Sequence, residues 1–187
     1  MKRSTISFVL LPAFCFFLAT CKKSGGNSDV INIQGFYTTD YNGNSLGWQG
    51  PQDNDWTFMT GLSSAELALF NFDTGLSLDN TVMTTIPNNV LAFPNPAGSV
   101  QAYYFSTQDS NVVKLVIVDA ALHVVSKQAI KVKGSNFIHL DVSNRTQYPN
   151  HTSFRAYYSF SAKDHPDYKV GFGDIRICDG TTIAGCF

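Results

Sequence analysis

The stretch Val112-Val113-Lys114-Leu115-Val116-Ile117-Val118 is apolar at every position except Lys114. A short, continuous apolar run bounded by polar residues predicts a strand that is buried on both faces. Valine and isoleucine dominate the run, and β-branched side chains favour strands over helices. This segment therefore predicts a fold built from β-strands, with this strand at its centre.

Further strand patterns lie on both sides of the run, separated by clusters of Asn, Gly, Pro and Asp. In one of them apolar residues alternate with polar ones from Phe154 to Phe160, as expected of a half-buried strand. Strands are predicted at Ile31–Thr39, Trp56–Met59, Val100–Phe105, Leu122–Val132, Phe137–Val142 and Tyr168–Cys178. Short strands at this spacing predict an all-β, immunoglobulin-like antiparallel β-sandwich with at most one short helix.

Three local patterns refine this prediction. Ser63 and Glu66 have the spacing of a capping box, in which each side chain bonds the other residue's backbone N–H at the start of a helix. Gly171 and Gly173 in the last strand predict a bulge or a close approach of another group to the backbone. Residues 47–55 are rich in Gly, Pro, Asn and Asp and are predicted to form a loop.

The N-terminus carries a basic start and an apolar run from Ile6 to Leu18 that is too short to span a membrane. It ends in Leu18-Ala19-Thr20-Cys21, which resembles the lipobox of bacterial lipoproteins, although Thr20 departs from the usual Gly, Ala or Ser. The resemblance implies a signal peptide at residues 1–20 and a lipid on Cys21. Residues 21–30 would form a flexible tether, and residues 31–187 a single domain. An ordinary secretory signal is the alternative.

Cys178 and Cys186 are close in sequence near the C-terminus and flank an Asp-Gly turn signal. An oxidising compartment outside the cytoplasm would allow a disulfide between them. Two free thiols are the alternative, and a metal site lacks a nearby histidine in sequence. We expect the disulfide.

The segment Phe93-Pro94-Asn95-Pro96 resembles the opening motif of the C-terminal sorting domains found on type IX secretion cargo of Bacteroidetes. The resemblance implies an immunoglobulin-like sandwich and a bacterial lipoprotein of that phylum. The two prolines predict an edge or crossing strand, because proline withholds a backbone donor. The chain lacks the family's closing segment and its basic sorting tail, so the sorting function is not carried over.

Aromatic side chains gather in the first third of the mature chain. Tyr37, Tyr41, Trp48 and Trp56 would suit stacking on sugar rings if they are exposed, and they are candidate ligand-binding residues. The alternative is that they belong to the core, as aromatic residues in strands usually do.

Oxygen-bearing side chains in the same region are candidate calcium ligands. Asp40, Asp53 and Asp55 lie in two polar loops, and calcium takes six to eight oxygen ligands. The loops lack the glycine spacing of an EF-hand, and the alternative is a pair of Asx turns. We predict no metal or other cofactor beyond this calcium possibility.

The chain has a net charge of −1 and no basic cluster that would bind nucleic acid. No Gly-x-Ser-x-Gly, His-Glu-x-x-His or phosphate-binding glycine loop is present. We therefore expect a non-enzymatic binding or structural module, lipid-anchored in the bacterial cell envelope and most naturally at the outer membrane, with a glycan or protein partner. The first alternative is an accessory protein of type IX secretion or gliding machinery. The second is a carboxylate-based hydrolase.

Overall fold

The computed structural model describes residues 30–78, 90–179 and 183–186. These form β1 (Phe36–Thr39), β2 (Ser45–Gln49), β3 (Thr57–Met59), α1 (Ser64–Ala68), β4 (Leu91–Phe93), β5 (Val100–Val118), β6 (Val124–Asp141), β7 (Thr152–Ala162), β8 (His165–Ile177) and the 3-10 helix η1 (Ile183–Cys186). All pairs between these strands are antiparallel. The predicted all-β, sandwich-like fold with one short α-helix is confirmed. The predicted signal, Cys21 and the tether up to residue 29 lie outside the described residues.

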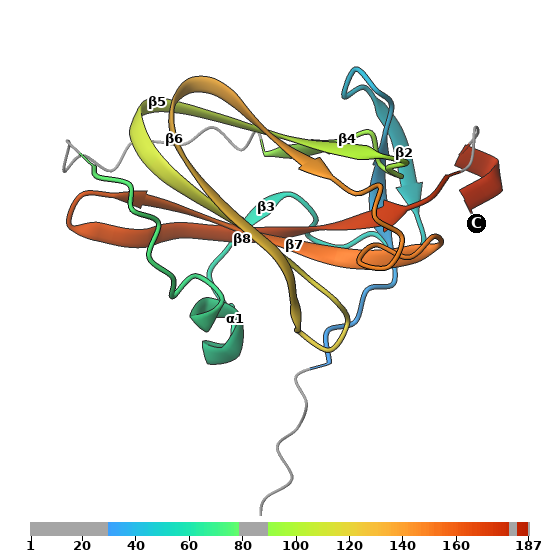
Figure 1. Ribbon diagram of the computed structural model, residues 1–187, viewed down its shortest axis with the longest axis horizontal. Helices are drawn as coiled ribbons and strands as arrows, with labels where there is room; N and C mark the ends of the chain where they lie inside the picture. The colour runs from blue at the N-terminus through green and yellow to red at the C-terminus, as the bar shows by residue number, and fades with distance from the viewer. Residues whose placement is uncertain (1–29, 79–89, 180–182, 187) are drawn as a thin grey trace, which may run out of the picture.

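One long hairpin, β5 with β6, runs through the whole fold (Figure 1). The two strand segments predicted at Val100–Phe105 and Val112–Val118 are the two halves of β5, and β6 likewise joins two predicted strands. The ladder continues through the polar residues between the halves, with a register shift between Thr107 and Asn111. Strand pairing rests on backbone groups that every non-proline residue carries, so a polar interval need not end a strand.

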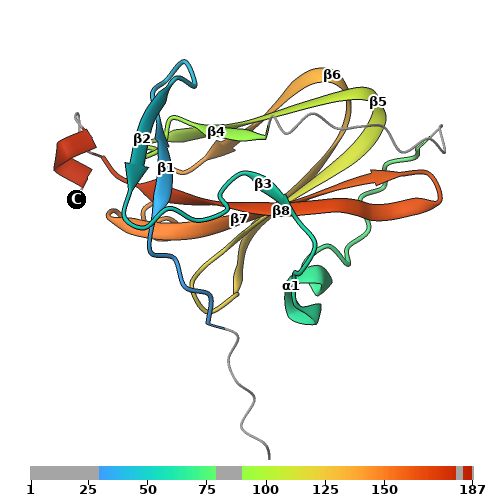
Figure 2. The same ribbon diagram turned by 180° about the vertical axis from the view of Figure 1, so that it is seen from behind.

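The long hairpin gives the fold two layers. The first half of β5 pairs with β4 along its second edge, whereas the second half pairs with β7. β8 then pairs with β7, and β3 pairs with β8. Figures 1 and 2 show β4 and the adjoining parts of β5 and β6 above β7 and β8. The half of β5 that carries Val112–Val118 is thus central in its layer, as its apolar sequence predicts.

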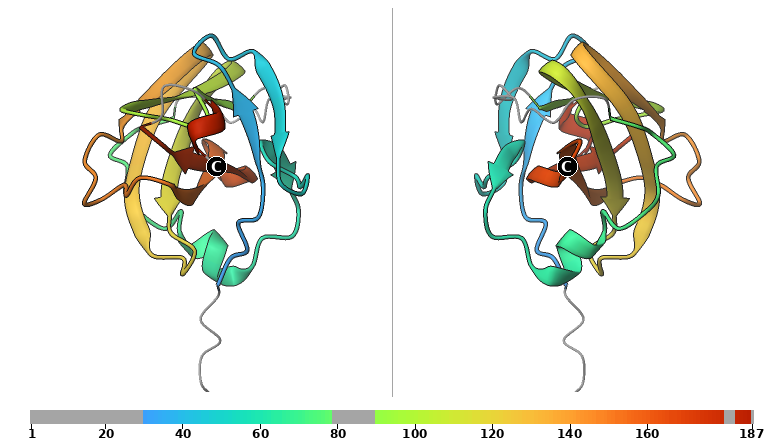
Figure 3. Two further views of the ribbon diagram at one scale, coloured as in Figure 1. Left: turned by 90° about the vertical axis from the view of Figure 1, so that its right-hand side faces the viewer. Right: turned by 90° about the vertical axis from the view of Figure 1, so that its left-hand side faces the viewer.

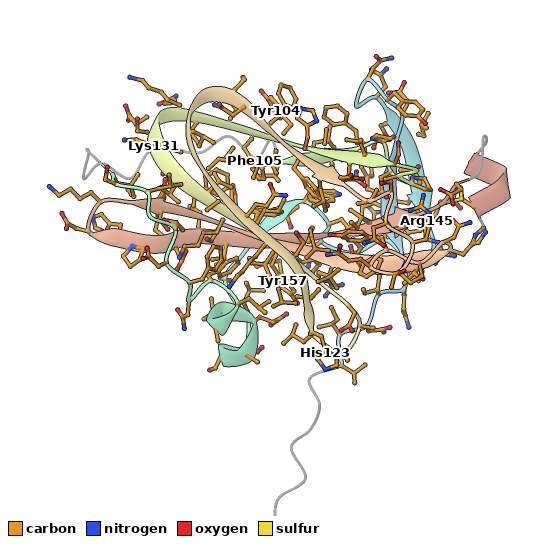
Figure 4. All side chains as sticks on the ribbon, viewed as in Figure 1. Tyr104, Phe105, His123, Lys131, Arg145 and Tyr157 are labelled. Carbon is orange, nitrogen blue, oxygen red and sulfur yellow. A yellow bond between two sulfur atoms is a disulfide. The ribbon has the colours of Figure 1, made fainter. Side chains whose placement is uncertain are left out.

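The main core fills the space between the layers. Figure 4 shows Phe105 there, and its side chain is fully buried. Trp56 lies in the same core, with its indole against the backbone of Gly173, where a Cβ atom would overlap the ring. Gly171 is similarly close to Thr57 and Tyr158. The predicted close approach at both glycines is therefore confirmed.

A second, smaller core lies on the outer side of the β7–β8 layer. α1 covers this side, and Phe70, just after α1, is fully buried against Tyr157 and Phe172. The predicted capping box is present: the Glu66 backbone N–H donates to Ser63 Oγ at 3.3 Å, and the Ser63 N–H donates to Glu66 Oε2 at 2.7 Å. The five-residue helix is thus capped by its own sequence.

The β1–β2 hairpin stands at one side of the two layers (Figure 3). β1 is shorter than the strand predicted at Ile31–Thr39, and the prediction of a loop over residues 47–55 is wrong at its start. β2 continues to Gln49 because Gly47 and Trp48 pair with Thr38 and Tyr37 across the hairpin. Pairing with β1 satisfies the backbone hydrogen-bonding groups of this segment, so its glycine does not prevent a strand.

Asn95 joins this hairpin to the layers. Its side chain is fully buried; Nδ2 donates to the carbonyl oxygens of Tyr37 at 2.8 Å and Asp174 at 3.0 Å, and Oδ1 accepts from the Arg176 N–H at 2.9 Å. β4 ends just before it, at Phe93, on the edge of its sheet. The predicted edge position of the proline-rich segment is confirmed.

The predicted disulfide between Cys178 and Cys186 is present and ties η1 to the end of β8. Among the described residues, no helix has the length and apolar character needed to span a membrane.

Candidate functional site

The four aromatic residues predicted to bind a ligand do not form one site. Trp56 is 6% exposed and stacks on Tyr158 in the core, with ring centroids 6.3 Å apart, so its prediction as a ligand contact is wrong. Trp56 was grouped with Trp48 because the two are close in sequence. The strands that cover Trp56 are distant in sequence, so a local pattern does not reveal its burial. Tyr37 and Trp48 are half-buried and contact each other edge to face across the β1–β2 hairpin, at 5.5 Å between centroids.

Tyr41 is different, because it is 80% exposed at the turn of the β1–β2 hairpin and lies beside other exposed rings. These rings stand on the outer side of the layer formed by β4, β5 and β6. We call this surface the aromatic face; its members are Tyr41, Phe93, Val100, Tyr104, Phe137 and His139.

Strand register explains why these side chains share one side. Tyr104 faces Phe137 across β5 and β6, and Phe93 lies in the same row as His139, with Ala102 between them. Side chains opposite each other in paired strands point to the same side of a sheet. Figure 4 shows the result: Tyr104 points away from the molecule while its neighbour Phe105 points into the core.

Phe137 is at the centre of the aromatic face. Its ring contacts Tyr104, Phe93 and His139 at centroid distances of 5.3, 6.1 and 6.1 Å, yet it remains 48% exposed. Beside it is a hollow of about 280 Å³ whose walls include Tyr41, Phe93 and His139. The face therefore combines exposed ring surfaces with a concave edge.

Two of the three predicted calcium ligands do come together, but with a third residue that the sequence did not suggest. Carboxylate oxygens of Asp53, Asp55 and Asp174 lie within 4.8 Å of one another, Asp174 being on β8. Asp40 does not join them. Its side chain accepts bonds from Asn42 and Asn44 in its own turn, as the Asx-turn alternative predicts.

Arg155 offsets part of the negative charge of this acidic cluster. Its Nε and Nη2 donate to the two oxygens of Asp174 at 2.7 Å each, and its guanidinium lies 3.9 Å from the centroid of Phe172. The two oxygens of Asp55 accept the backbone N–H groups of Tyr37 at 3.1 Å and Asp174 at 2.7 Å. The carboxylates are thus engaged with protein donors, and the cluster fastens β1 and the β2–β3 loop to β8.

Burial of the cluster changes its acid–base behaviour. Desolvation, together with the charges of Asp174 and Asp53, raises the pKa of Asp55 to about 8 against the opposing effect of its two backbone donors. Desolvation also raises the pKa of Asp174 to about 6, although its bonds to Arg155 act in the opposite direction. Both carboxyls therefore take up protons more readily in the folded protein than in the unfolded chain.

The stability of the protein should fall as the pH rises from about 5 to about 8. The unfolded chain has already lost the Asp55 proton in this range, whereas the folded chain still holds it, so each pH unit lowers the free energy of unfolding by up to about 1.4 kcal/mol. Asp55→Asn does not ionise and should flatten this dependence. Urea denaturation at pH 5, 6.5 and 8 measures the effect, with Asp164→Asn, at an exposed position, as the control. An unchanged slope in Asp55→Asn would contradict the assignment to Asp55.

Glu66, the remaining acid considered for catalysis, is also occupied. Its Oε1 accepts the hydroxyl of Tyr157 at 2.5 Å, while Oε2 accepts the N–H of Ser63. Hydrogen bonds from Tyr157 and Ser63 lower the pKa of Glu66 despite its partial burial. The group is held as a helix-capping carboxylate.

The aromatic face was missed by the sequence analysis except for Tyr41. A usable signal was present, because Phe137 and His139 alternate with the buried Ile138 and Leu140. Ring side chains at the positions that point away from the core indicate an exposed aromatic surface on the outer side of the strand. A comparison with protein-family models finds no match, and neither does a comparison with curated proteins.

Proposed function

We propose that this protein is a non-catalytic carbohydrate-binding module, anchored by lipid on Cys21 in a bacterial cell envelope, that holds its ligand on the aromatic face. The exposed ring cluster around Phe137 is the observation that carries the proposal. Contiguous exposed apolar patches on soluble domains are commonly interaction sites, because water contact with the rings is unfavourable.

The chemistry of the face favours a sugar over a charged ligand. The C–H face of a pyranose packs on aromatic rings, and its hydroxyls need hydrogen-bonding groups at the edge of the rings. The hydroxyl of Tyr104 lies 2.9 Å from that of Ser135, and Ser99 and His139 line the hollow. Among the described residues that line this hollow there is no carboxylate and no lysine.

The same lining supports a binding role without catalysis. Hydrolysis of a glycosidic bond ordinarily requires two carboxyl groups on either side of the scissile bond. Among the described residues, Asp55, Asp174 and Glu66 are engaged in buried or capping bonds on elements other than β4–β6. Asp141, opposite Val100 at the end of β6, accepts the Ser143 backbone N–H at 2.9 Å.

The position of the N-terminal segment suits a tethered module. The Ile31 N–H donates to the carbonyl of Ala120 at 2.9 Å, at the turn between β5 and β6. Val100, on the aromatic face, is at the opposite end of β5. The described chain begins on the α1 side of the molecule, away from the aromatic face (Figure 1). A lipid on Cys21 would therefore attach at the end of the molecule opposite the aromatic face.

Substitution of Phe137 by alanine should weaken carbohydrate binding by more than about tenfold with little change in stability. Truncation of a central aromatic contact in an interface typically costs ~2 kcal/mol of binding free energy. Phe137 is half exposed, so folding depends on it less than on a core residue. The measurement is a glycan array with the soluble domain, followed by calorimetric titration of the oligosaccharides that bind.

Leu67→Ala is the matched control, since Leu67 is 44% exposed on α1, away from the aromatic face. It should leave binding unchanged. Absence of binding to any oligosaccharide, or equal binding by the wild type and Phe137→Ala, would overturn the proposal and favour a protein partner.

A further inference from the structure

We propose that a second site, beside Arg176, binds an oxyanion: a phosphate or carboxylate group carried by a small ligand. The site is a hollow of about 290 Å³ on the outer side of the β7–β8 layer, where the N-terminal segment and β2 pass over it. Its walls include Gln34, Phe36, Gln49, Gly50, Ser153 and Arg176. It shares no lining residue with the hollow of the aromatic face.

Two glycines give this hollow its shape. A Cβ atom at Gly35 would overlap the carbonyl oxygen of Pro51, and one at Gly50 would overlap that of Gln34. The two backbone segments can approach this closely only because neither residue has a side chain. Gln34 and Gln49, which flank the close contact, are thereby held at the wall of the hollow.

Arg176 supplies a charge that no described carboxylate pairs with. Its Nη1 donates to Ser153 Oγ at 3.2 Å, and its buried Nε has no hydrogen-bond partner among the described residues. Ser153 faces Arg176 across β7 and β8, which holds the guanidinium at this place. The other two described arginines differ, because Arg155 pairs with Asp174 and Arg145 with Asp179.

An unpaired, partly buried guanidinium is energetically unfavourable, and burial lowers the pKa of Arg176 accordingly. An anion with two oxygens would pair with the terminal nitrogens Nη1 and Nη2, because the planar guanidinium donates two parallel hydrogen bonds to a carboxylate or phosphate. The neighbouring hydroxyl of Ser153 and the amides of Gln34 and Gln49 offer further donors, and the described walls of the hollow include no acidic residue. These features together select an oxyanion over a cation or a neutral ligand.

The test is a titration of the full chain in a phosphate-free buffer, followed by NMR chemical shifts or calorimetry. The probes are inorganic phosphate and glucuronate. We expect saturable binding of at least one of them by the wild type, and an affinity at least about tenfold lower in Arg176→Met, because charge-assisted bonds are the strongest polar contacts in such a site. Lys163→Met removes an equal charge at an exposed position in the β7–β8 turn, just before the other end of β8, and should bind as the wild type does.

Arg176→Lys keeps the charge and most of the side chain but loses the two-pronged donor geometry. It should fold as the wild type does, as measured by circular dichroism and thermal unfolding. It should still bind the probes several-fold more weakly, because lysine cannot donate the two parallel hydrogen bonds that arginine donates. It therefore decides the question if Arg176→Met proves unstable. Saturable binding that is equal in the wild type and both variants, or no binding of either probe, would overturn the proposal.

Vesicles containing phosphatidylglycerol distinguish the source of the oxyanion. Sedimentation of the chain with these vesicles, lost in Arg176→Lys, would identify a lipid headgroup. Binding of free phosphate or glucuronate without vesicle binding would identify a soluble ligand. Both results support the site, and neither depends on carbohydrate binding at the aromatic face.

Discussion

Replacement of Gly173 by alanine is expected to destabilise the protein by about 3 kcal/mol, the upper part of the usual range for overpacking a core. The added methyl group would overlap the six-membered ring of Trp56, which is itself fixed against Tyr158 and Tyr103. A rigid indole between two layers cannot rotate away as a flexible surface side chain could. The measurement is urea denaturation followed by circular dichroism.

Gly61→Ala is the control, because a Cβ atom at Gly61 has no neighbour within 4 Å. It should change stability by less than about 0.5 kcal/mol, as surface substitutions usually do. A second variant tests the stated cause. Trp56→Leu removes the ring, so the combination of Gly173→Ala with Trp56→Leu should cost clearly less than the sum of the two. Full additivity would show that the overlap with Trp56 is not the reason.

Arg155→Met should be destabilising by about 3–5 kcal/mol at neutral pH, because it leaves a buried carboxylate without its partner. Asp174 is fully buried, and both of its oxygens depend on the Arg155 guanidinium. The variant also removes the cation that lies 3.9 Å from Asp53, so the charges of Asp53 and Asp174 are no longer offset, while Asp55, whose pKa is about 8, stays largely protonated. The loss should be smaller at pH 5, because Asp174, whose pKa is about 6 even with Arg155 beside it, is then protonated.

The cost is measured as the free energy of unfolding in urea at pH 5 and pH 7.5. Lys133→Met is the matched control, since Lys133 is exposed and loses the same charge. Adding Asp174→Leu to Arg155→Met should recover much of the loss, because a well-packed apolar pair can replace a buried ion pair. A cost under about 1 kcal/mol in the single variant would contradict the role given to Arg155.

Much of the local structure followed from short-range patterns. The apolar run Val112–Val118 identified the central strand, because burial on both faces leaves no polar positions. Ser63 and Glu66 identified the helix start, since a capping box needs only four consecutive residues. Cys178 and Cys186 are near enough in sequence that their pairing could be inferred from the loop between them.

The boundaries of long strands did not follow in the same way. The polar interval between the halves of β5 led to a prediction of two separate strands, yet the backbone ladder continues with a register shift. The loop predicted from Gly47 onward was wrong at its start for a similar reason. The glycine content of this segment does not reveal that it pairs with β1. Strand ends are determined by the partner strand, which a local pattern does not contain.

By itself, the sequence determined the fold class, the capped helix, the disulfide and the close approach at Gly173. Only the tertiary structure decided which aromatic residues are exposed. Trp56 is covered by the layers, while Phe137 is brought beside Phe93 and Tyr104 from separate strands. It likewise brought Asp174 to Asp53 and Asp55, and left Arg176 without an acid among the described residues. The reason is physical: strand register and the layer change of β5 determine which side of a sheet a side chain occupies, and both depend on residues far apart in the chain.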